Sequence, residues 1–259
     1  MLPEITPEDL SASLDAVVAE VLGESGIHRP PVDALVIARA LRITVAIDSR
    51  QRGRGRYVRL RASRGRAARP AVLLRPDPRP ERLQWALAHE LGEHLAHRVF
   101  VVLGIDPRET GPEARERVAS HLAGRLLVPG LWFAADGAAC AWDLSYLKAR
   151  YSTASHELIA RRMLELPPPV IITIFDHQQV SFRRSNVPGR VPPVSAAELR
   201  CWQAVHQSAQ PCRLSHMAWI IQGWPVHEDG WKREVLRTEV QLEFVEGEPT
   251  ADAQEVDAA

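Results

Sequence analysis

The chain has 259 residues, of which 46% are hydrophobic, and its 32 basic and 32 acidic residues give a formal net charge of zero. This length suits one large domain or two small ones, and the apolar fraction is sufficient for a real core. No uninterrupted apolar run approaches the roughly 18 residues that a membrane span requires, and we expect no signal peptide in the acidic segment 1–4. These features argue against a membrane protein and predict a globular, cytoplasmic one.

The charge is unevenly placed along the chain. Nine arginines fall between Arg50 and Arg69, whereas the segment from Glu239 onward is acidic. A solvated loop and a frayed tail would explain this asymmetry, and a nucleic acid or an acidic partner is the alternative. The cysteines lie far apart and contain no C-x-x-C pair, so we expect Cys140, Cys201 and Cys212 to be reduced thiols.

Apolar periodicity and capping residues predict the first elements. We expect helices over residues 6–23 and 32–41 and strands over residues 43–47 and 71–74. Arginines alternate with glycines over residues 50–56, which indicates a mobile hairpin or loop.

The next helix, which begins near residues 78–81, carries the clearest chemical pattern. In the zinc motif H-E-x-x-H, two ligands stand one helical turn apart and the intervening Glu activates a water. Here His89 and Glu90 fit the motif, and Glu93 occupies the second ligand position, where a carboxylate binds zinc at about the same distance as an imidazole. His97 lies about 12 Å along the helix from His89, so a third ligand should come from another segment. Pairing of these buried polar groups with nearby arginines is the alternative.

A following helix over about residues 112–127 supplies the candidates for that third ligand. Pro129 ends it. Glu113 lies in the first turn, where a carboxylate already interacts favourably with the helix dipole. Glu116 is favoured because the rest of its helical stripe is small and apolar.

These segments together resemble the ImmA/IrrE family of metallopeptidases. The resemblance extends over about residues 10–165 and rests on the order and spacing of four stretches, namely residues 30–33, 38–45, 88–92 and 116–129. It implies a zinc endopeptidase that cleaves helix-turn-helix repressors and so releases genes for stress response or mobile-element transfer. It also implies zinc ligands at His89, Glu93 and Glu116 and a general base at Glu90.

The chain departs from the family pattern at two places. Glu93 stands where the family usually has a second His, and residues 120–122 replace its usual Asn-x-Phe. Two carboxylate ligands would offset the charge of the zinc ion, so we expect slow turnover.

Two short helices follow, over about residues 143–151 and 155–164. Their tight turn and the basic residues Lys148, Arg150, Arg161 and Arg162 resemble a DNA-binding helix-turn-helix, although a purely structural helix pair has the same pattern. Tyr151 would assist an oxyanion or contact substrate if it faced the metal, and packing is its alternative role.

After residue 167 the pattern changes to strands. We expect a hairpin over 170–184, a Pro-rich linker over 186–193, a helix over 195–206, and strands over 217–224 and 231–244 that flank a loop over 225–230. Four tryptophans lie between Trp202 and Trp231 and indicate either a small sheet packed by aromatic rings or an exposed recognition surface.

The predicted architecture is α+β. A mainly helical, zincin-like peptidase domain with a short sheet occupies residues 6–166, a β-rich region residues 167–247, and a disordered tail residues 248–259. The predicted function is that of a regulatory zinc endopeptidase acting on a protein such as a helix-turn-helix repressor. The alternative is a peptidase-fold protein that binds a repressor or DNA without cleaving it. The two functions differ in whether Glu93 serves as the second zinc ligand.

Overall fold

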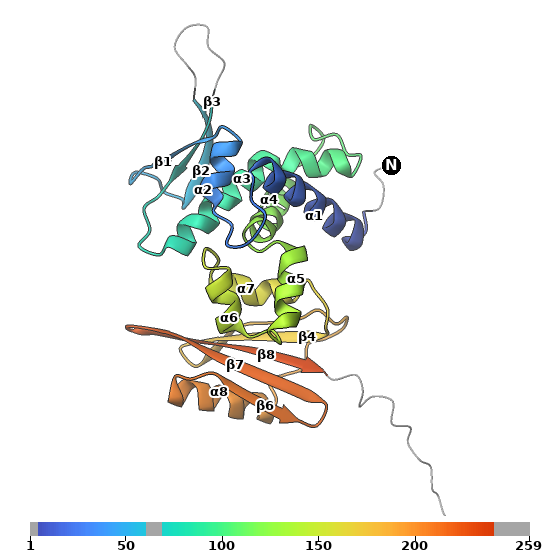
Figure 1. Cartoon of the computed structure of the whole chain (residues 1–259), viewed down its shortest axis with the longest axis vertical. Helices are drawn as coiled ribbons and strands as arrows, with labels where there is room; N and C mark the ends of the chain where they lie inside the picture. Colours follow the sequence, from blue (N-terminus) through green and yellow to red (C-terminus); the bar gives the residue numbers. More distant parts are fainter. Residues whose placement is uncertain (1–4, 61–68, 241–259) are drawn as a thin grey trace, which may run out of the picture. The chain divides into compact units, whose positions relative to one another are not determined.

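The structure is a computed structural model that describes residues 5–60 and 69–240 (Figure 1). The chain divides between Arg162 and Met163 into two compact units, which we call the N-terminal and C-terminal units. The N-terminal unit is mainly helical and contains a three-stranded sheet, and the C-terminal unit contains a five-stranded sheet. The predicted α+β class is therefore confirmed. The tail over residues 248–259 lies outside the described residues.

The helices of the N-terminal unit account for most of its core. They are α1 (Pro7–Glu24), α2 (Ala34–Ala40), α3 (Pro80–Val102), α4 (Pro112–Leu127), α5 (Gly130–Ala139), α6 (Leu144–Arg150) and α7, which ends at the boundary (His156–Met163). The sequence predicted each of them except α5. Thr6 is the N-cap of α1, and its hydroxyl accepts a hydrogen bond from the backbone N–H of Asp9.

The sheet of the N-terminal unit has the strand order β1-β3-β2. Strand β1 (Thr44–Ile47) runs parallel to β3 (Arg69–Leu74), and β2 (Gly55–Leu60) runs antiparallel to β3. Of the arginine-rich stretch over residues 50–56, residues 50–54 lie in the loop that precedes β2, as one of the two alternatives predicted. Strands β2 and β3 form a hairpin that was not predicted, and its connection over residues 61–68 lies outside the described residues. Strand β2 is an edge strand, and helix α3 packs against β2 and β3.

None of the described helices is by itself long and apolar enough to cross a membrane. Helices α4 and α5 reach that length and composition only when they are taken together across a 48° bend.

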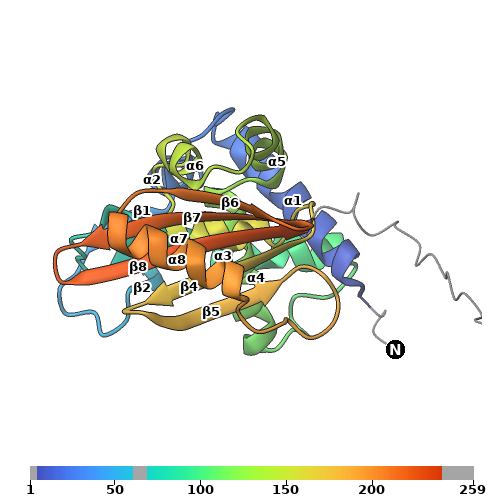
Figure 2. The same cartoon turned by 90° about the horizontal axis from the view of Figure 1, so that it is seen from below.

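The C-terminal unit is an antiparallel sheet with the strand order β5-β4-β8-β7-β6. Its strands are β4 (Val170–Asp176), β5 (Gln179–Ser185), β6 (Cys212–His216), β7 (Trp219–Glu228) and β8 (Trp231–Val240). Helix α8 (Ala196–Ser208) lies across one face of this sheet, over β6, β7 and β8 (Figure 2). The predicted β4–β5 hairpin and the predicted helix over 195–206 are confirmed, and Ser195 is the N-cap of that helix.

Strand β7 is longer than predicted, and β6 was not predicted at all. We expected a loop over residues 225–230, but β7 continues to Glu228 and the connection contains only Asp229 and Gly230. Gly230 has a φ of +71°, which suits a two-residue hairpin turn. Pro225 is tolerated in β7 because β6 pairs only as far as Gly223, so β7 has an open edge at the proline.

Aromatic and aliphatic side chains form the core between α8 and the sheet. The core contains Phe175, Ala197, Cys201, Ile221 and Leu236, and Trp202 and Trp219 pack against it. For these two tryptophans the packing interpretation is confirmed. Gly223 lets α8 lie close to β7, since a Cβ at this position would lie 2.9 Å from a methyl group of Val205.

Candidate metal centre

Helix α3 presents His89 and Glu93 one turn apart, with Glu90 on a different face. The His89 side chain keeps 19% of its accessible surface and Glu93 is exposed, whereas Glu90 is buried. The helix is anchored by Leu87, Leu91 and Leu95, which are at most 1% exposed. A buried spine therefore fixes the direction in which the polar side chains point.

A glycine lets the second helix of the site come close. A Cβ added to Gly92 of α3 would lie 2.5 Å from the carbonyl oxygen of Ala119 on α4, so only glycine fits between the two backbones. His89 precedes Gly92 by three residues and Glu116 precedes Ala119 by three. This contact brings one turn of each helix together, and His89 Nε2 lies 3.2 Å from Glu116 Oε1.

The replacement Gly92→Ala should therefore damage the site through the backbone. We expect a loss of about 1–3 kcal/mol of stability, typical of overpacking, together with weaker metal binding as α4 moves away from α3. Urea unfolding and zinc titration of the full chain would measure the two effects. Gly23→Ala in α1 is the matched control, because a Cβ there meets no atom within 4 Å and should leave both properties intact or stabilise the helix.

The structure brings the three predicted ligands together. One ligand atom each from His89, Glu93 and Glu116 lies within 4.8 Å of the other two. Glu113, the other candidate for the third position, is not part of this group. Two ligands of one tetrahedral zinc ion stand roughly 3.3 Å apart, given bond lengths of about 2.0–2.1 Å. The donor types and the 3.2 Å separation of His89 from Glu116 thus fit zinc. The exposure of the two glutamates suits a site with one position open to substrate.

Glu90 lies between this group and the edge strand β2. Its Oε2 accepts a hydrogen bond of 2.6 Å from the backbone N–H of Tyr57, and its Oε1 lies where a Cβ on Gly55 would approach to 2.8 Å. Burial, followed by the nearby charge of Glu93, raises the pKa of Glu90, and the Tyr57 hydrogen bond opposes this shift. A carboxylate held in this way accepts a proton more readily than an exposed one.

The contribution of β2 was missed by the sequence reasoning. Gly55 and Tyr57 lie in the arginine-rich stretch, where the only visible signal was the Arg-Gly alternation. The phenol of Tyr57 also lies 3.0 Å from His94 Nδ1, and the two ring centroids are 5.3 Å apart. This contact directs His94 away from the ligand group and toward β2.

Tyr151 is placed in the core of the N-terminal unit. Its side chain has no exposed surface, its ring packs edge-on against Phe133, and its hydroxyl donates to Asp136 at 2.8 Å. Burial and this hydrogen bond raise the pKa of Tyr151 well above its usual value. These contacts favour the packing role that was the alternative to oxyanion stabilisation.

The basic residues around α6 and α7 are engaged within the protein. Lys148 pairs with Glu81 at 2.8 Å, Arg150 with Asp136 and Arg161 with Glu157, while Arg162 is 2% exposed and donates to Val128 O. Such contacts reduce the positive charge that this helix pair offers to DNA.

Comparison with known proteins identifies a likeness in fold. A Mycobacterium tuberculosis transcriptional regulator of known structure is similar to this chain with a TM-score of 0.65 and 18% identity, over 90% of this chain and 77% of that one. No protein-family model and no curated protein matches the sequence. At this identity the likeness shows the fold alone.

Proposed function

We propose that the chain is a zinc-dependent endopeptidase of regulatory type, related to the ImmA/IrrE metallopeptidases. The observation that carries the proposal is the convergence of His89, Glu93 and Glu116 beside the buried carboxylate of Glu90. This is the arrangement that the H-E-x-x-[H/E] pattern with a third ligand on the next helix requires. The partly buried imidazole of His89 and the buried carboxylate of Glu90 distinguish this group from a cluster of exposed acids alone.

Each residue has a separate role in the proposed reaction. His89, Glu93 and Glu116 would hold a zinc ion, which supplies Lewis acidity toward a scissile carbonyl and an attacking water. Glu90, oriented by the Tyr57 N–H, would take a proton from that water and deliver it to the leaving amine. Two carboxylates among the three ligands lower the net positive charge of the centre, which favours slow turnover.

The proposed substrate is a protein segment in an extended conformation, such as part of a helix-turn-helix repressor. Strand β2 is an edge of the sheet and lies against Glu90, so a peptide added along it would pass close to the base. The proposed role is in transcription regulation, which accords with the name of the structural neighbour from Mycobacterium tuberculosis, and the proposed location is the cytoplasm. Stress-response or mobile-element genes are the proposed targets.

A binding protein without peptidase activity is the second candidate. It is favoured by a pocket beside the start of α3 whose lining includes Arg54, Arg75 and Arg82 and only one carboxylate, Asp77. Arg82 pairs with Asp77 at 3.6 Å, and the basic lining that Arg54 and Arg75 add suits an anionic partner such as a phosphate backbone or an acidic segment of a repressor. Salt-sensitive binding to DNA without any cleavage would support this candidate.

The metal content of the purified chain tests the first candidate. After zinc loading and removal of free metal, we expect elemental mass spectrometry to find one equivalent of zinc more in wild type than in His89→Ala or Glu116→Ala. The matched control is Glu113→Ala, which removes an exposed carboxylate from the same helix without touching the ligand group. Equal zinc content in wild type and both ligand variants would sink the peptidase proposal.

A further inference from the structure

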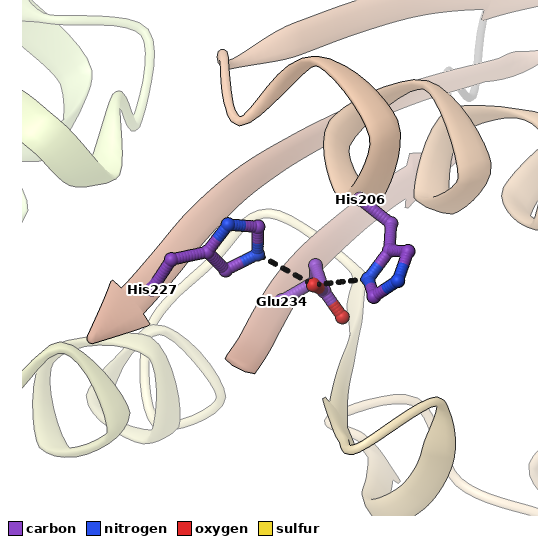
Figure 3. A group of neighbouring side chains, drawn as sticks. All are labelled: His206, His227 and Glu234. Carbon is purple, nitrogen blue, oxygen red and sulfur yellow. Dashed lines mark hydrogen bonds and ion pairs between the residues drawn. The ribbon is translucent and has the colours of Figure 1, made fainter. Parts of the chain in front are cut away.

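The C-terminal unit contains a second group of metal-ligand side chains, separate from the first. His206, His227 and Glu234 each offer one ligand atom, and these atoms lie within 4.8 Å of one another. Figure 3 shows both imidazole rings pointing at the same carboxylate oxygen. His206 Nδ1 lies 2.8 Å from Glu234 Oε1, and His227 Nε2 lies 2.6 Å from it.

The fold brings these residues together from three elements. Glu234 of β8 pairs with Pro225 of β7, so His227, two residues beyond Pro225, projects from the same face of the sheet. Helix α8 covers that face and contributes His206. The group therefore links one helix to both strands of a hairpin.

Glu234 is a fixed carboxylate at the base of the group. It has no exposed surface, and its second oxygen, Oε2, accepts a hydrogen bond of 3.0 Å from Trp202 Nε1. Burial alone would raise the pKa of Glu234, but the hydrogen bonds from His206, His227 and Trp202 outweigh it and hold the pKa below its usual value. The carboxylate is thus ionised and oriented by an outer partner, as metal-binding carboxylates commonly are.

The two imidazoles form the accessible side of the group. The side chains of His206 and His227 keep 19% and 16% of their accessible surface. Trp202 stacks on His206 with ring centroids 5.4 Å apart, and Phe175 stacks on Trp202 at 5.1 Å. Stacking restricts the rotation of His206, so the ligand geometry is largely set before any ion arrives.

We propose that His206 Nδ1, His227 Nε2 and the Glu234 carboxylate form a second binding site for a zinc-type divalent ion, which joins α8 to the β7–β8 hairpin. Two imidazoles and one carboxylate are a ligand set that proteins use for zinc with one position open. An ion with bonds of about 2.0–2.1 Å would need the ligand atoms roughly 3.3 Å apart, slightly more than their present separations. A small shift of His227, the ring outside the Phe175–Trp202–His206 stack, would supply that change.

The ring protons have a place to go when an ion binds. In the hydrogen-bonded arrangement, His206 Nδ1 and His227 Nε2 donate to the Glu234 carboxylate. When an ion takes these nitrogens, each ring carries its proton on the other nitrogen.

Binding at this site should stabilise the C-terminal unit. An ion held by three elements binds only when they are folded together, so saturation raises the free energy of unfolding by mass action. At free zinc 100 times the dissociation constant the gain is about 2.7 kcal/mol. The first metal centre lies in the other unit, which makes the two effects separable.

The experiment uses the full chain with the first centre removed. In a His89→Ala/Glu116→Ala background, we would titrate zinc against a chromophoric chelator and, in parallel, record the visible absorption of bound cobalt. We expect one equivalent of metal, lost in the added variants His206→Ala and His227→Ala. His216→Ala is the matched control, because it removes an exposed histidine from the same sheet and should leave that equivalent in place.

Circular dichroism checks that each variant folds. Glu234→Gln is a third ligand variant, because its amide oxygen can still accept the hydrogen bond from Trp202. The second site would be overturned if the His89→Ala/Glu116→Ala background bound no metal. It would also be overturned if metal remained after each of the added changes His206→Ala, His227→Ala and Glu234→Gln, and the group would then be a hydrogen-bonded triad only. Neither result bears on the first centre. A loss of one equivalent of metal in the single variant His89→Ala, compared with wild type, would still support the peptidase proposal.

Discussion

Replacing Glu90 with Gln is expected to lower the rate of peptide cleavage by about 10²–10⁴-fold while zinc remains bound. The amide oxygen of Gln can still accept the hydrogen bond from the Tyr57 N–H, so the side chain keeps its place beside β2. It can no longer take a proton from water. The predicted defect is therefore in the chemical step, and neither the fold nor the metal content should change.

A quenched fluorogenic peptide library, followed by helix-turn-helix repressors from the same genome, would measure the effect of Glu90→Gln. The control is Glu113→Gln, an isosteric change at an exposed carboxylate outside the ligand group. Undiminished cleavage by Glu90→Gln would refute the base role. A wild-type chain that binds zinc at His89 yet cleaves no peptide or repressor would favour the binding alternative.

Helical periodicity was enough to predict the elements that carry the first centre. The spacing of Leu87, Leu91 and Leu95 defined α3, and the helical stripe of Glu116 defined the facing side of α4. The close approach of the two helices was not predictable from local pattern. In the sequence, Gly92 indicates only a position that weakens a helix. Its contact with the backbone of Ala119 shows that a side chain at this position would not fit.

The strand β2 and the second ligand group show where the sequence reasoning failed. Tyr57 lies in a stretch dominated by arginines, whose long stems are compatible with an edge strand but do not signal one. His227 was placed in the predicted loop over residues 225–230 because no partner for it stands at a suitable spacing in the sequence. Its partners, His206 and Glu234, come from other elements, so only the strand register and the position of α8 bring them together.

The largest effect on stability is expected from Glu198→Ala in α8. Glu198 is 2% exposed and accepts hydrogen bonds from Arg183 at 3.0 and 3.1 Å, from the Ser195 N–H at 2.8 Å and from the Thr238 hydroxyl at 2.8 Å. Its loss leaves Arg183, a mostly buried guanidinium, without its carboxylate and removes half of the capping box of α8. Breaking one side of a buried ion pair costs about 3–5 kcal/mol.

The pH dependence of the same network has a definite sign. Burial would raise the pKa of Glu198, but the contacts with Arg183, Ser195 and Thr238 prevail and lower it. The stabilisation is therefore present above the unfolded pKa of about 4.3 and is lost as the pH falls through the lower folded value. Glu198→Ala should flatten this acid-induced loss of stability, because the titrating group is absent.

Urea unfolding followed by tryptophan fluorescence would measure the effect of Glu198→Ala, since four of the seven tryptophans lie between Trp202 and Trp231. The matched control is Gln203→Ala on the exposed side of α8, which should change stability by no more than about 0.5 kcal/mol. If the two variants unfold at the same urea concentration, the Glu198 network does not hold α8 to the sheet. The core of Phe175, Cys201 and Leu236 would then account for the packing of this helix without help from the buried charge.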